Sequence, residues 1–231
     1  MRCIQRNYRR YRRVFFYKNK CTGCGRCRDL RVDNEDFICF NGAKDICGKE
    51  YDPEEILKEV IKDKVFYKNS GGGVTFSGGE PVLQNVFLKG ILSRCKEAGI
   101  HTAVDTCGNV AWSAFEKVLP FTDLFLYDFK CADPEKHRLL TGSSNTLILE
   151  NLKKLDAAGK KIEIRMVMVP EHNMAESDLL DAGAFLSSLE NLSCVRLLAY
   201  HSLARSKFKA VGHPDTMPDV PSPEAETLDE C

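Results

Sequence analysis

The stretch Gly71-Gly-Gly-Val-Thr-Phe-Ser-Gly-Gly-Glu-Pro81 decides how the rest of the chain is interpreted. Its β-branched and aromatic run Val74-Thr-Phe76 predicts a short strand, the Ser-Gly-Gly predicts a turn, and the proline predicts a helix start. In α/β proteins, small ligands bind where a strand ends and its helix begins. Gly78 and Gly79 allow close approach of the main chain or a positive φ, and Glu80 can bind an amine. The same residues also fit a plain glycine-rich loop with a solvated glutamate.

Length and composition indicate an ordinary globular protein. The 231 residues suffice for one large domain or one with a small appendage, and shares of 43% hydrophobic and 29% charged residues are usual. Lys and Arg number 33, as do Asp and Glu, so net charge predicts neither a nucleic-acid nor a membrane partner. No apolar run approaches the roughly 18 residues of a membrane helix. The N-terminus lacks an apolar signal core, and we expect a cytoplasmic protein.

Cysteine is unusually frequent, with eleven residues, three of them in the window Cys21-Thr-Gly-Cys24-Gly-Arg-Cys27. A reducing compartment would not keep disulfides at such spacing, so metal or iron–sulfur ligation is favoured. Residues 21–50 have little periodicity and carry two more cysteines, Cys39 and Cys47. We therefore predict a small module that folds around its metal. A structural zinc site would use the same kind of ligands.

Both ends of the chain differ in composition from the rest. Residues 1–20 form a basic stub, with six arginines in the first thirteen positions and interleaved aromatic residues. Such an arm can bind RNA, although charge runs are more often solvated or disordered. Residues 214–231 are rich in proline and acidic residues, and form either a terminal extension or the start of a helix. Between these ends, residues 51–213 are expected to form a barrel domain.

Helix and strand patterns alternate from residue 51 onward. Asp52 is predicted to cap a helix whose first residue is Pro53. Five strands separated by helices, without hairpin signals, predict a parallel sheet. From residue 51 to the end the chain has about 180 residues, fewer than the ~250 residues of an eight-unit barrel, so we expect a partial barrel. The predicted strands are 73–77, 101–106, 123–130, 161–169 and 194–199. Helices are predicted between them over 81–98, 112–118 and 176–189, and the segment 133–158 is predicted to be a loop followed by a helix that ends at Gly159.

The helix predicted over 81–98 has an apolar stripe that should face the core, with Gly99 as its stop. Cys95 lies in this stripe and is expected to be plain core. The stripe consists of Leu83, Phe87, Leu88, Ile91, Leu92 and Cys95.

Polar side chains follow at the carboxyl ends of the predicted strands. In a parallel barrel these ends face one side, so the side chains should converge there. Carboxylates suit an amine or a bound cation and arginine suits a carboxylate, so the set suits a zwitterionic ligand. Ordinary explanations remain open, because Asp105 can cap a helix, Arg165 can pair with Glu163, and His201 can be a loop histidine. The set is Gly78-Gly79-Glu80, Asp105-Thr106, Asp128 with Lys130, Arg165, and Tyr200-His201.

These motifs, in this order, resemble the activating enzymes of glycyl-radical enzymes, the pyruvate formate-lyase activase branch of radical S-adenosylmethionine (SAM) proteins. The resemblance spans nearly the whole chain and implies an α/β fold, a partial (β/α)6-type barrel that lacks its first strand. It rests on Val74-Thr-Phe-Ser-Gly-Gly-Glu-Pro81, Asp105-Thr-Cys-Gly108, Asp128-Phe-Lys130, His137 with Thr141-Gly142, Arg165 followed by Val167-Met-Val-Pro170, and Tyr200-His201 with Leu203 and Lys207.

The resemblance implies an activity and its partners. Family members reductively cleave SAM at a [4Fe-4S] cluster, and the deoxyadenosyl radical takes a hydrogen from a backbone glycine of a partner enzyme. A flavodoxin or ferredoxin supplies the electron. The implied roles are Gly78, Gly79 and Glu80 for the SAM amino group, Asp105, Thr106 and Asp128 for a monovalent cation or the methionyl end, and Lys130, Arg165 and His201 for the walls of the SAM site.

The cysteine segment 21–50 is similar to the ferredoxin-like insert of this branch. Cys21, Cys24 and Cys27 would bind one [4Fe-4S] cluster. Cys39 is the preferred fourth ligand, because Ile38-Cys39-Phe40-Asn41-Gly42-Ala43 looks like the closing cysteine segment of the family. Cys47 is the reserve candidate.

One family motif is missing, the N-terminal Cys-x3-Cys-x2-Cys that binds the SAM-cleaving cluster. Met1-Arg2-Cys3-Ile4-Gln5-Arg6 resembles its end, with Cys3 at the middle cysteine and Arg6 in place of the last one. We expect a fragment or a mis-started reading frame. A degenerate relative that binds SAM, an iron–sulfur cluster or zinc without turnover is the alternative, and ligands from a partner are a third explanation.

Overall fold

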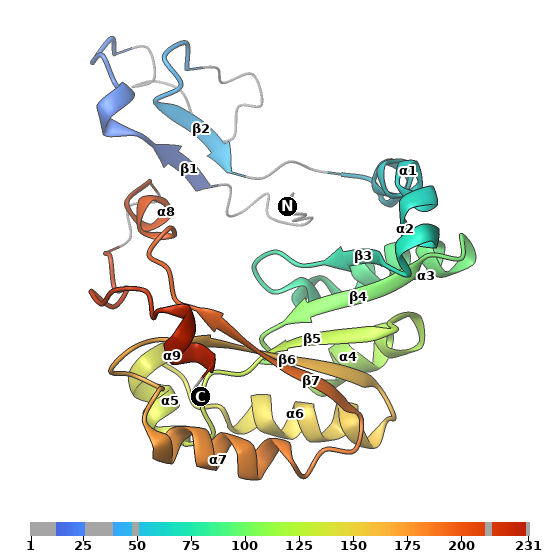
Figure 1. Ribbon diagram of the computed structural model, residues 1–231. Coiled ribbons are helices and arrows are strands. Elements are labelled where there is room, and N and C mark those ends of the chain that lie inside the picture. The colour runs from blue at the N-terminus through green and yellow to red at the C-terminus, as the bar shows by residue number, and fades with distance from the viewer. Residues whose placement is uncertain (1–12, 26–38, 48–50, 211–213, 230–231) are drawn as a thin grey trace. The chain divides into compact units, whose positions relative to one another are not determined.

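The computed structural model describes residues 13–25, 39–47, 51–210 and 214–229 (Figure 1). The chain divides into two compact units. The first contains Tyr51–Tyr200 and the described chain from Val220 onward. The second contains the described residues between 13 and 47 together with His201–Asp219. The predicted domain limits are not the same as these units and remain a prediction.

The first unit is built on a parallel sheet of five strands in the order β3-β4-β5-β6-β7. Each strand pairs in parallel with the strand that follows it along the chain. The predicted α/β class with a parallel sheet is therefore confirmed. The strands are β3 (Gly73–Phe76), β4 (His101–Thr106), β5 (Leu124–Asp128), β6 (Lys161–Met168) and β7 (Leu192–Ala199).

Helices connect successive strands, and α3, α4, α6 and α7 lie along one side of the sheet in Figure 1. The segment 133–158, expected to be a loop followed by one helix, contains two helices, and Gly142 with φ +82° ends the first of them. The α-helices are α1 (Pro53–Lys62), α2 (Lys64–Ser70), α3 (Asn85–Glu97), α4 (Trp112–Val118), α5 (Pro134–Thr141), α6 (Thr146–Ala157), α7 (Glu176–Leu186) and α9 (Ala225–Asp229), with 3-10 turns η2 (Pro81–Gln84) and η3 (Leu119–Phe121).

Alternation along the strands separates a packed face of the sheet from an open one. On β6, the side chains of Ile162, Ile164, Met166 and Met168 are buried, whereas those between them are only half-buried. Strand β5 repeats this pattern. Because successive side chains point to opposite faces, the apolar set packs against the helices and the remaining set lies on the open face. That open face carries the charged residues of the candidate site.

Local signals at helix ends agree with the structure except at one turn. The Glu54 N–H donates to Asp52 Oδ1 at 2.9 Å, so the predicted cap at Asp52 is confirmed. Gly99 follows α3 with φ +69°, as its role as a stop requires. The placement of Leu83 in the buried stripe is wrong, because its side chain is 62% exposed and Val82 is buried instead. The chain begins this segment with η2, which has three residues per turn and therefore rotates the first turn relative to α3.

The second unit contains a two-stranded antiparallel sheet that the sequence did not predict. Strand β1 (Arg13–Phe16) pairs with β2 (Lys44–Cys47). The short helices η1 (Lys18–Lys20) and α8 (Arg205–Ala210) also belong to this unit. Arg205 pairs with Asp215 and Asp219, both at 3.1 Å, and thereby ties the segment after α8 to the helix.

No helix in the described ranges is both long and apolar enough to cross a membrane.

Candidate functional site

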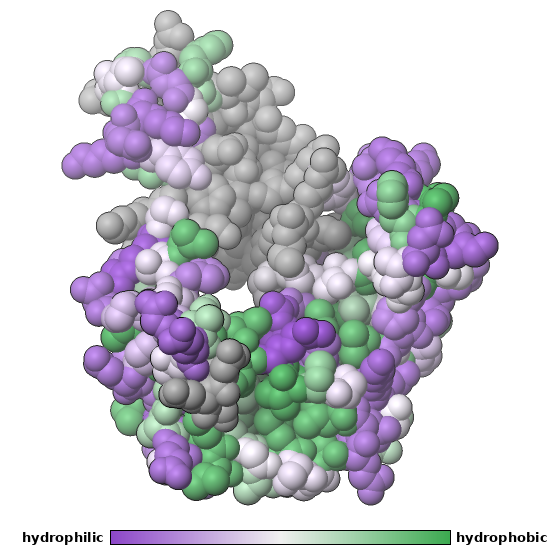
Figure 2. Space-filling view, viewed as in Figure 1, coloured by the Kyte–Doolittle hydropathy of each residue, from purple (hydrophilic) through white to green (hydrophobic). Residues whose placement is uncertain are grey.

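The carboxyl ends of β3 to β6 bring together most of the predicted site residues. Strand register places Asp105 beside Leu126 and Asp128 beside Arg165 on neighbouring strands. The side chains of Asp105, Asp128 and Arg165 are half-buried. In Figure 2 a hydrophilic area lies over the middle strands, bordered by apolar surface, in keeping with charged side chains on this face. The predicted convergence is therefore seen for these strand ends.

Glu80 joins the end of β3 to the end of β4. Its Oε1 accepts from the Val82 N–H at 3.1 Å and from Thr106 Oγ1 at 2.8 Å, and its Oε2 accepts from the Cys107 N–H at 2.9 Å. An ionised carboxylate has about four acceptor positions. Within the described residues Oε2 accepts one backbone hydrogen bond, and it can also accept from an external donor such as an amine. The interpretation of Glu80 as a merely solvated loop residue is wrong, because its carboxylate holds two strand ends together.

Two glycines of the strand-end loops occupy conformations or spaces that favour glycine. Gly78 has φ +152°, which residues with a side chain rarely adopt. Gly108 has φ +75°, and a Cβ there would lie 1.7 Å from Tyr127 Oη. The Gly108 N–H also donates to Thr106 Oγ1 at 3.0 Å. The turn after β4 therefore requires glycine at position 108.

Asp105 and Arg165 form an ion pair across the open face. Arg165 Nη1 donates to Asp105 Oδ2 at 2.8 Å. Burial raises the pKa of the Asp105 carboxyl, Arg165 opposes this, and the neighbouring charges of Asp128 and Glu80 add to the rise. Arg165 thus pairs with Asp105, whereas Glu163, its ordinary candidate partner, pairs with Arg196.

Asp128 also forms an ion pair with a basic side chain, because Lys130 Nζ lies 2.5 Å from Asp128 Oδ2. The two aspartates of the site are therefore already paired with basic residues. Within the described ranges, no group of three or more His, Cys, Asp or Glu side chains is arranged to hold a metal ion. A monovalent cation at Asp105, Thr106 and Asp128 remains a prediction.

Other predicted residues lie elsewhere or outside the described ranges. His201 is exposed and belongs to the second unit, so its place in the site remains a prediction. His137 is buried, with Nδ1 2.7 Å from the Ser143 carbonyl, and thus supports the end of α5. Cys3 and Cys27 lie outside the described residues.

Three predicted ligands of the cysteine cluster can be placed. Cys21 and Cys24 are exposed free thiols, and Cys39 is half-buried. The Ala43 N–H donates to Cys39 Sγ at 3.3 Å. Hydrogen bonding from the backbone, first of all from Lys44, lowers the pKa of the Cys39 thiol, which favours the thiolate that binds metal.

The sequence interpretation missed the residues that support these loops. Asn145, Asn151 and Asn173 are each almost fully buried beside the strand ends. One signal was available, because Asn151 has the spacing of the buried stripe of α6, which includes Ile148, Leu152 and Leu155. A polar side chain on a buried stripe needs hydrogen-bond partners.

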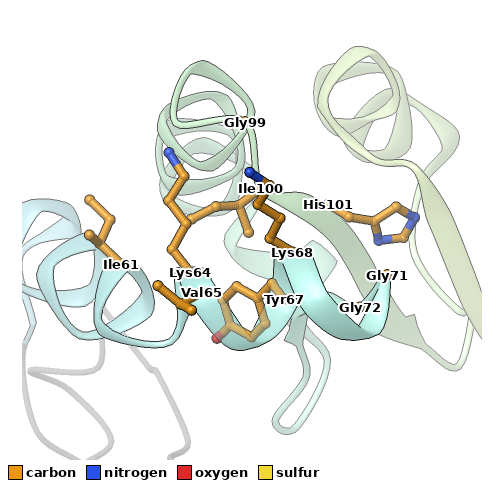
Figure 3. A pocket seen from close by; sticks show the side chains of 10 residues that line it. All are labelled: Ile61, Lys64, Val65, Tyr67, Lys68, Gly71, Gly72, Gly99, Ile100 and His101. Atoms are coloured by element: carbon orange, nitrogen blue, oxygen red, sulfur yellow. The ribbon is translucent and has the colours of Figure 1, made fainter.

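A separate cavity of about 600 Å³ lies at the opposite, amino ends of β3 and β4. It is lined by Lys64, Tyr67, Lys68 and His101 among others, and by none of the predicted site residues. Figure 3 shows Lys64 and Lys68 extending from α2 toward Gly99 and Ile100, with His101 apart from them. Lysines near the C-terminus of a helix, here α3, have an ordinary role in balancing its dipole. We therefore place the candidate site at the carboxyl ends, where both charge signs occur together with a carboxylate that can accept from an amine.

Comparison with known proteins identifies the family of this chain. The pattern of the Radical SAM superfamily matches residues 18–182. The trans-4-hydroxy-L-proline dehydratase activating enzyme of Clostridioides difficile is 37% identical over 246 aligned residues, which cover 95% of this chain and 80% of that protein. The pyruvate formate-lyase-activating enzyme of Staphylococcus aureus (strain USA300) is 38% identical, over 78% of this chain and 74% of that protein.

A solved structure agrees with the sequence relatives. The crystal structure of a domain of pyruvate-formate lyase-activating enzyme from Bacteroides vulgatus ATCC 8482 has 33% sequence identity and a TM-score of 0.57, covering 69% of this chain and 90% of that one. The chain belongs to the radical SAM superfamily, among the enzymes that activate glycyl-radical enzymes.

Proposed function

We propose that this chain binds SAM at the carboxyl ends of β3 to β6 and serves to generate a glycyl radical on a partner enzyme. The observation that carries the proposal is that two hydrogen-bonded pairs, Thr106 with Glu80 and Arg165 with Asp105, lie at adjacent strand ends. The partner is a glycyl-radical enzyme, and the electron donor is a flavodoxin or ferredoxin. The relatives' names point to more than one kind of partner enzyme.

The residues present fit the charges of SAM. Its methionyl end carries an amine and a carboxylate, and the site offers both carboxylates and basic groups. Glu80 Oε2 can accept from the amine in addition to its backbone hydrogen bond, with Gly78 and Gly79 beside it in the loop. The Arg165 guanidinium has five N–H donors, of which Nη1 contacts Asp105. Gly78, Gly79 and Glu80 would hold the amine, and Lys130, Arg165 and His201 would line the rest.

When bound, SAM and the family's [4Fe-4S] cluster supply the reductive cleavage that starts hydrogen abstraction. The sequence contains no Cys-x3-Cys-x2-Cys run, so its residues do not fit that cluster in the family's manner. What this chain's residues do is bind and orient the zwitterion on a half-buried face. A relative that binds SAM without cleaving it is therefore the second candidate.

We also propose that the insert holds a [4Fe-4S] cluster on Cys21, Cys24, Cys27 and Cys39. The N–H contact to Cys39 Sγ supports this, because hydrogen bonds to sulfur stabilise the thiolate. The finer architecture is part of the same proposal, with a basic stub at 1–20, the insert at 21–50, a partial barrel at 51–213 and a tail at 214–231.

Anaerobic reconstitution with iron and sulfide, followed by assay of deoxyadenosine after addition of SAM and dithionite, tests the proposal. Deoxyadenosine above the level of an Arg165→Ala variant supports an active enzyme. Bound SAM without deoxyadenosine leaves only the inactive relative. Metal analysis of Cys24→Ala against Cys194→Ala, a thiol on β7, tests the insert. One zinc and no sulfide would end the iron–sulfur assignment.

A further inference from the structure

Three buried asparagines bond the main chain of the strand-end loops. Asn145 is 1% exposed, Asn151 0% and Asn173 4%. Each one donates from its side-chain amide nitrogen to two backbone carbonyls. The carbonyls belong to the segments that follow β4 and β5 or to the end of β6. A pair of hydrogen bonds from a buried asparagine thus supports the main chain at the ends of three adjacent strands.

Asn151 is linked to Glu80 by a continuous chain of hydrogen bonds. Its Nδ2 donates to the carbonyls of Gly108 at 2.8 Å and Val110 at 2.7 Å. The Gly108 N–H donates to Thr106 Oγ1 at 3.0 Å, and Thr106 Oγ1 donates to Glu80 Oε1 at 2.8 Å. A side chain of α6 is therefore connected, through Gly108 and Thr106, to the carboxylate that would hold the SAM amine.

The same helix holds this loop at a second point. Tyr127 Oη donates to the Ile148 carbonyl at 2.7 Å, one turn before Asn151. The Tyr127 ring fills the space in which a side chain at position 108 would lie. The loop after β4 consequently packs against the Tyr127 ring, which is hydrogen-bonded to α6, and is also bonded by the Asn151 amide of α6.

The neighbouring loops have corresponding bonds. Asn145 Nδ2 donates to the carbonyls of Cys131 at 3.0 Å and Ala132 at 2.9 Å. Asn173 Nδ2 donates to the carbonyls of Lys130 at 3.0 Å and Val167 at 2.9 Å. These bonds fix the main chain next to Asp128 and Arg165. They do not touch the segment from Thr106 to Val110, so each loop has its own support.

Two of the three side-chain amides are not fully satisfied by hydrogen bonds. The Oδ1 atoms of Asn145 and Asn151 are buried and have no hydrogen-bond partner within the described part of the chain. A buried polar atom without a partner is costly, and an apolar residue at either position would avoid that cost. Each asparagine offsets this cost with two hydrogen bonds from its Nδ2 to backbone carbonyls.

We infer that Asn151 is a positioning residue of the SAM pocket, which holds residues 106–110 so that Thr106 and Glu80 keep their arrangement. The inference rests on the proposed function for the identity of the ligand. Asn151 acts through Gly108 and Thr106, and it does not itself touch the ligand position at Glu80 Oε2.

The test compares Asn151→Ala and Asn151→Asp with Asn191→Ala in the full chain. Asn191 is a matched control, because its Nδ2 donates to the Asp156 carbonyl at 2.9 Å at the opposite end of the sheet. Three quantities are measured for each protein: SAM affinity by calorimetry, the thermal midpoint, and the alkylation rate of Cys107 relative to Cys194 by peptide mass spectrometry.

Loss of the Asn151 amide should weaken SAM binding roughly 10- to 100-fold, by analogy with the range known for residues that orient metal ligands. Alkylation of Cys107 relative to Cys194 should rise roughly tenfold, because the loop opens more often. Asn191→Ala should lower the thermal midpoint and leave both other quantities within about twofold of wild type. The Asn151→Asp replacement preserves the side-chain volume and, with its buried carboxyl protonated, can still donate to one of the two carbonyls, so it serves where the alanine variant does not fold.

Two results would overturn the inference. One is a folded Asn151 variant with wild-type SAM affinity and wild-type Cys107 alkylation. The other is an equal effect of Asn191→Ala on both quantities, since that would reflect general destabilisation. If the wild-type chain does not bind SAM, the proposed function fails, and the Cys107 rate alone decides: an unchanged rate would refute the role of Asn151 in holding this loop.

Discussion

Replacement of Gly108 by alanine should destabilise the protein much more than a glycine replacement at an open position. Residue 108 has φ +75°, and the new Cβ would lie 1.7 Å from Tyr127 Oη and 2.2 Å from Tyr127 Cζ. The left-handed backbone costs an L-residue roughly 1–2 kcal/mol. Displacing the tyrosine breaks its bond to the buried Ile148 carbonyl, which costs about 1–3 kcal/mol more. The sum of about 2–5 kcal/mol is a large part of a typical stability of 5–15 kcal/mol, to order of magnitude.

Gly99→Ala is the matched control for this prediction. Gly99 has φ +69°, close to that of Gly108, but a Cβ there has no neighbouring atom within 4 Å. The control should therefore lose only the backbone contribution of about 1–2 kcal/mol. Equilibrium unfolding in urea, followed by the fluorescence of Trp112, the single tryptophan, measures both. Equal losses in the two variants would refute the close packing of Tyr127 against this turn.

Three further perturbations follow from the contacts described. Burial raises the pKa of Cys107 from 9.0 to about 11, so at pH 8 its alkylation should be about 100-fold slower than that of a thiol with the ordinary pKa, rising until about pH 11. Asp52→Ala should lower the free energy of unfolding by about 1 kcal/mol, because α1 loses its cap; an unchanged urea midpoint would contradict this. The Arg196 hydrogen bond lowers the pKa of Glu163, so it contributes stability above the ordinary glutamate pKa and loses it as pH falls through the lowered value. The stability difference between wild type and Arg196→Gln should therefore shrink below about pH 4, and a pH-independent difference would contradict the pair.

Local patterns were sufficient for the sheet of the first unit. The run His101–Thr106 is rich in β-branched residues, and the structure has β4 over the same residues. The five expected strands all form, and they lie in chain order because each is followed by a helix that returns the chain. Leu83 shows the limit of periodicity, because a 3-10 turn changes the angle between successive side chains while the sequence still reads as a helix.

Contacts between distant segments could not be obtained from such patterns. Strand β1 pairs with β2 across the cysteine segment, and no hairpin turn signals this pairing. Arg165 bonds Asp105, 60 residues away, although Glu163 was the nearer acid in the sequence. The convergence at strand ends followed from the parallel sheet alone, whereas the partner of each charge depends on register. Asn151 combined a local sign, a polar residue in a buried stripe, with distant partners that only the fold reveals.

SAM binding at the carboxyl ends of the strands is the central claim, and equilibrium dialysis of labelled SAM against the full chain tests it most directly. Glu80→Ala and Arg165→Ala each remove a group with charge complementary to the zwitterion, and each should weaken binding at least tenfold, to order of magnitude. Lys68→Ala alters only the cavity at the opposite end and should bind as wild type does. Unchanged affinity in both site variants, or a loss confined to Lys68→Ala, would contradict the account.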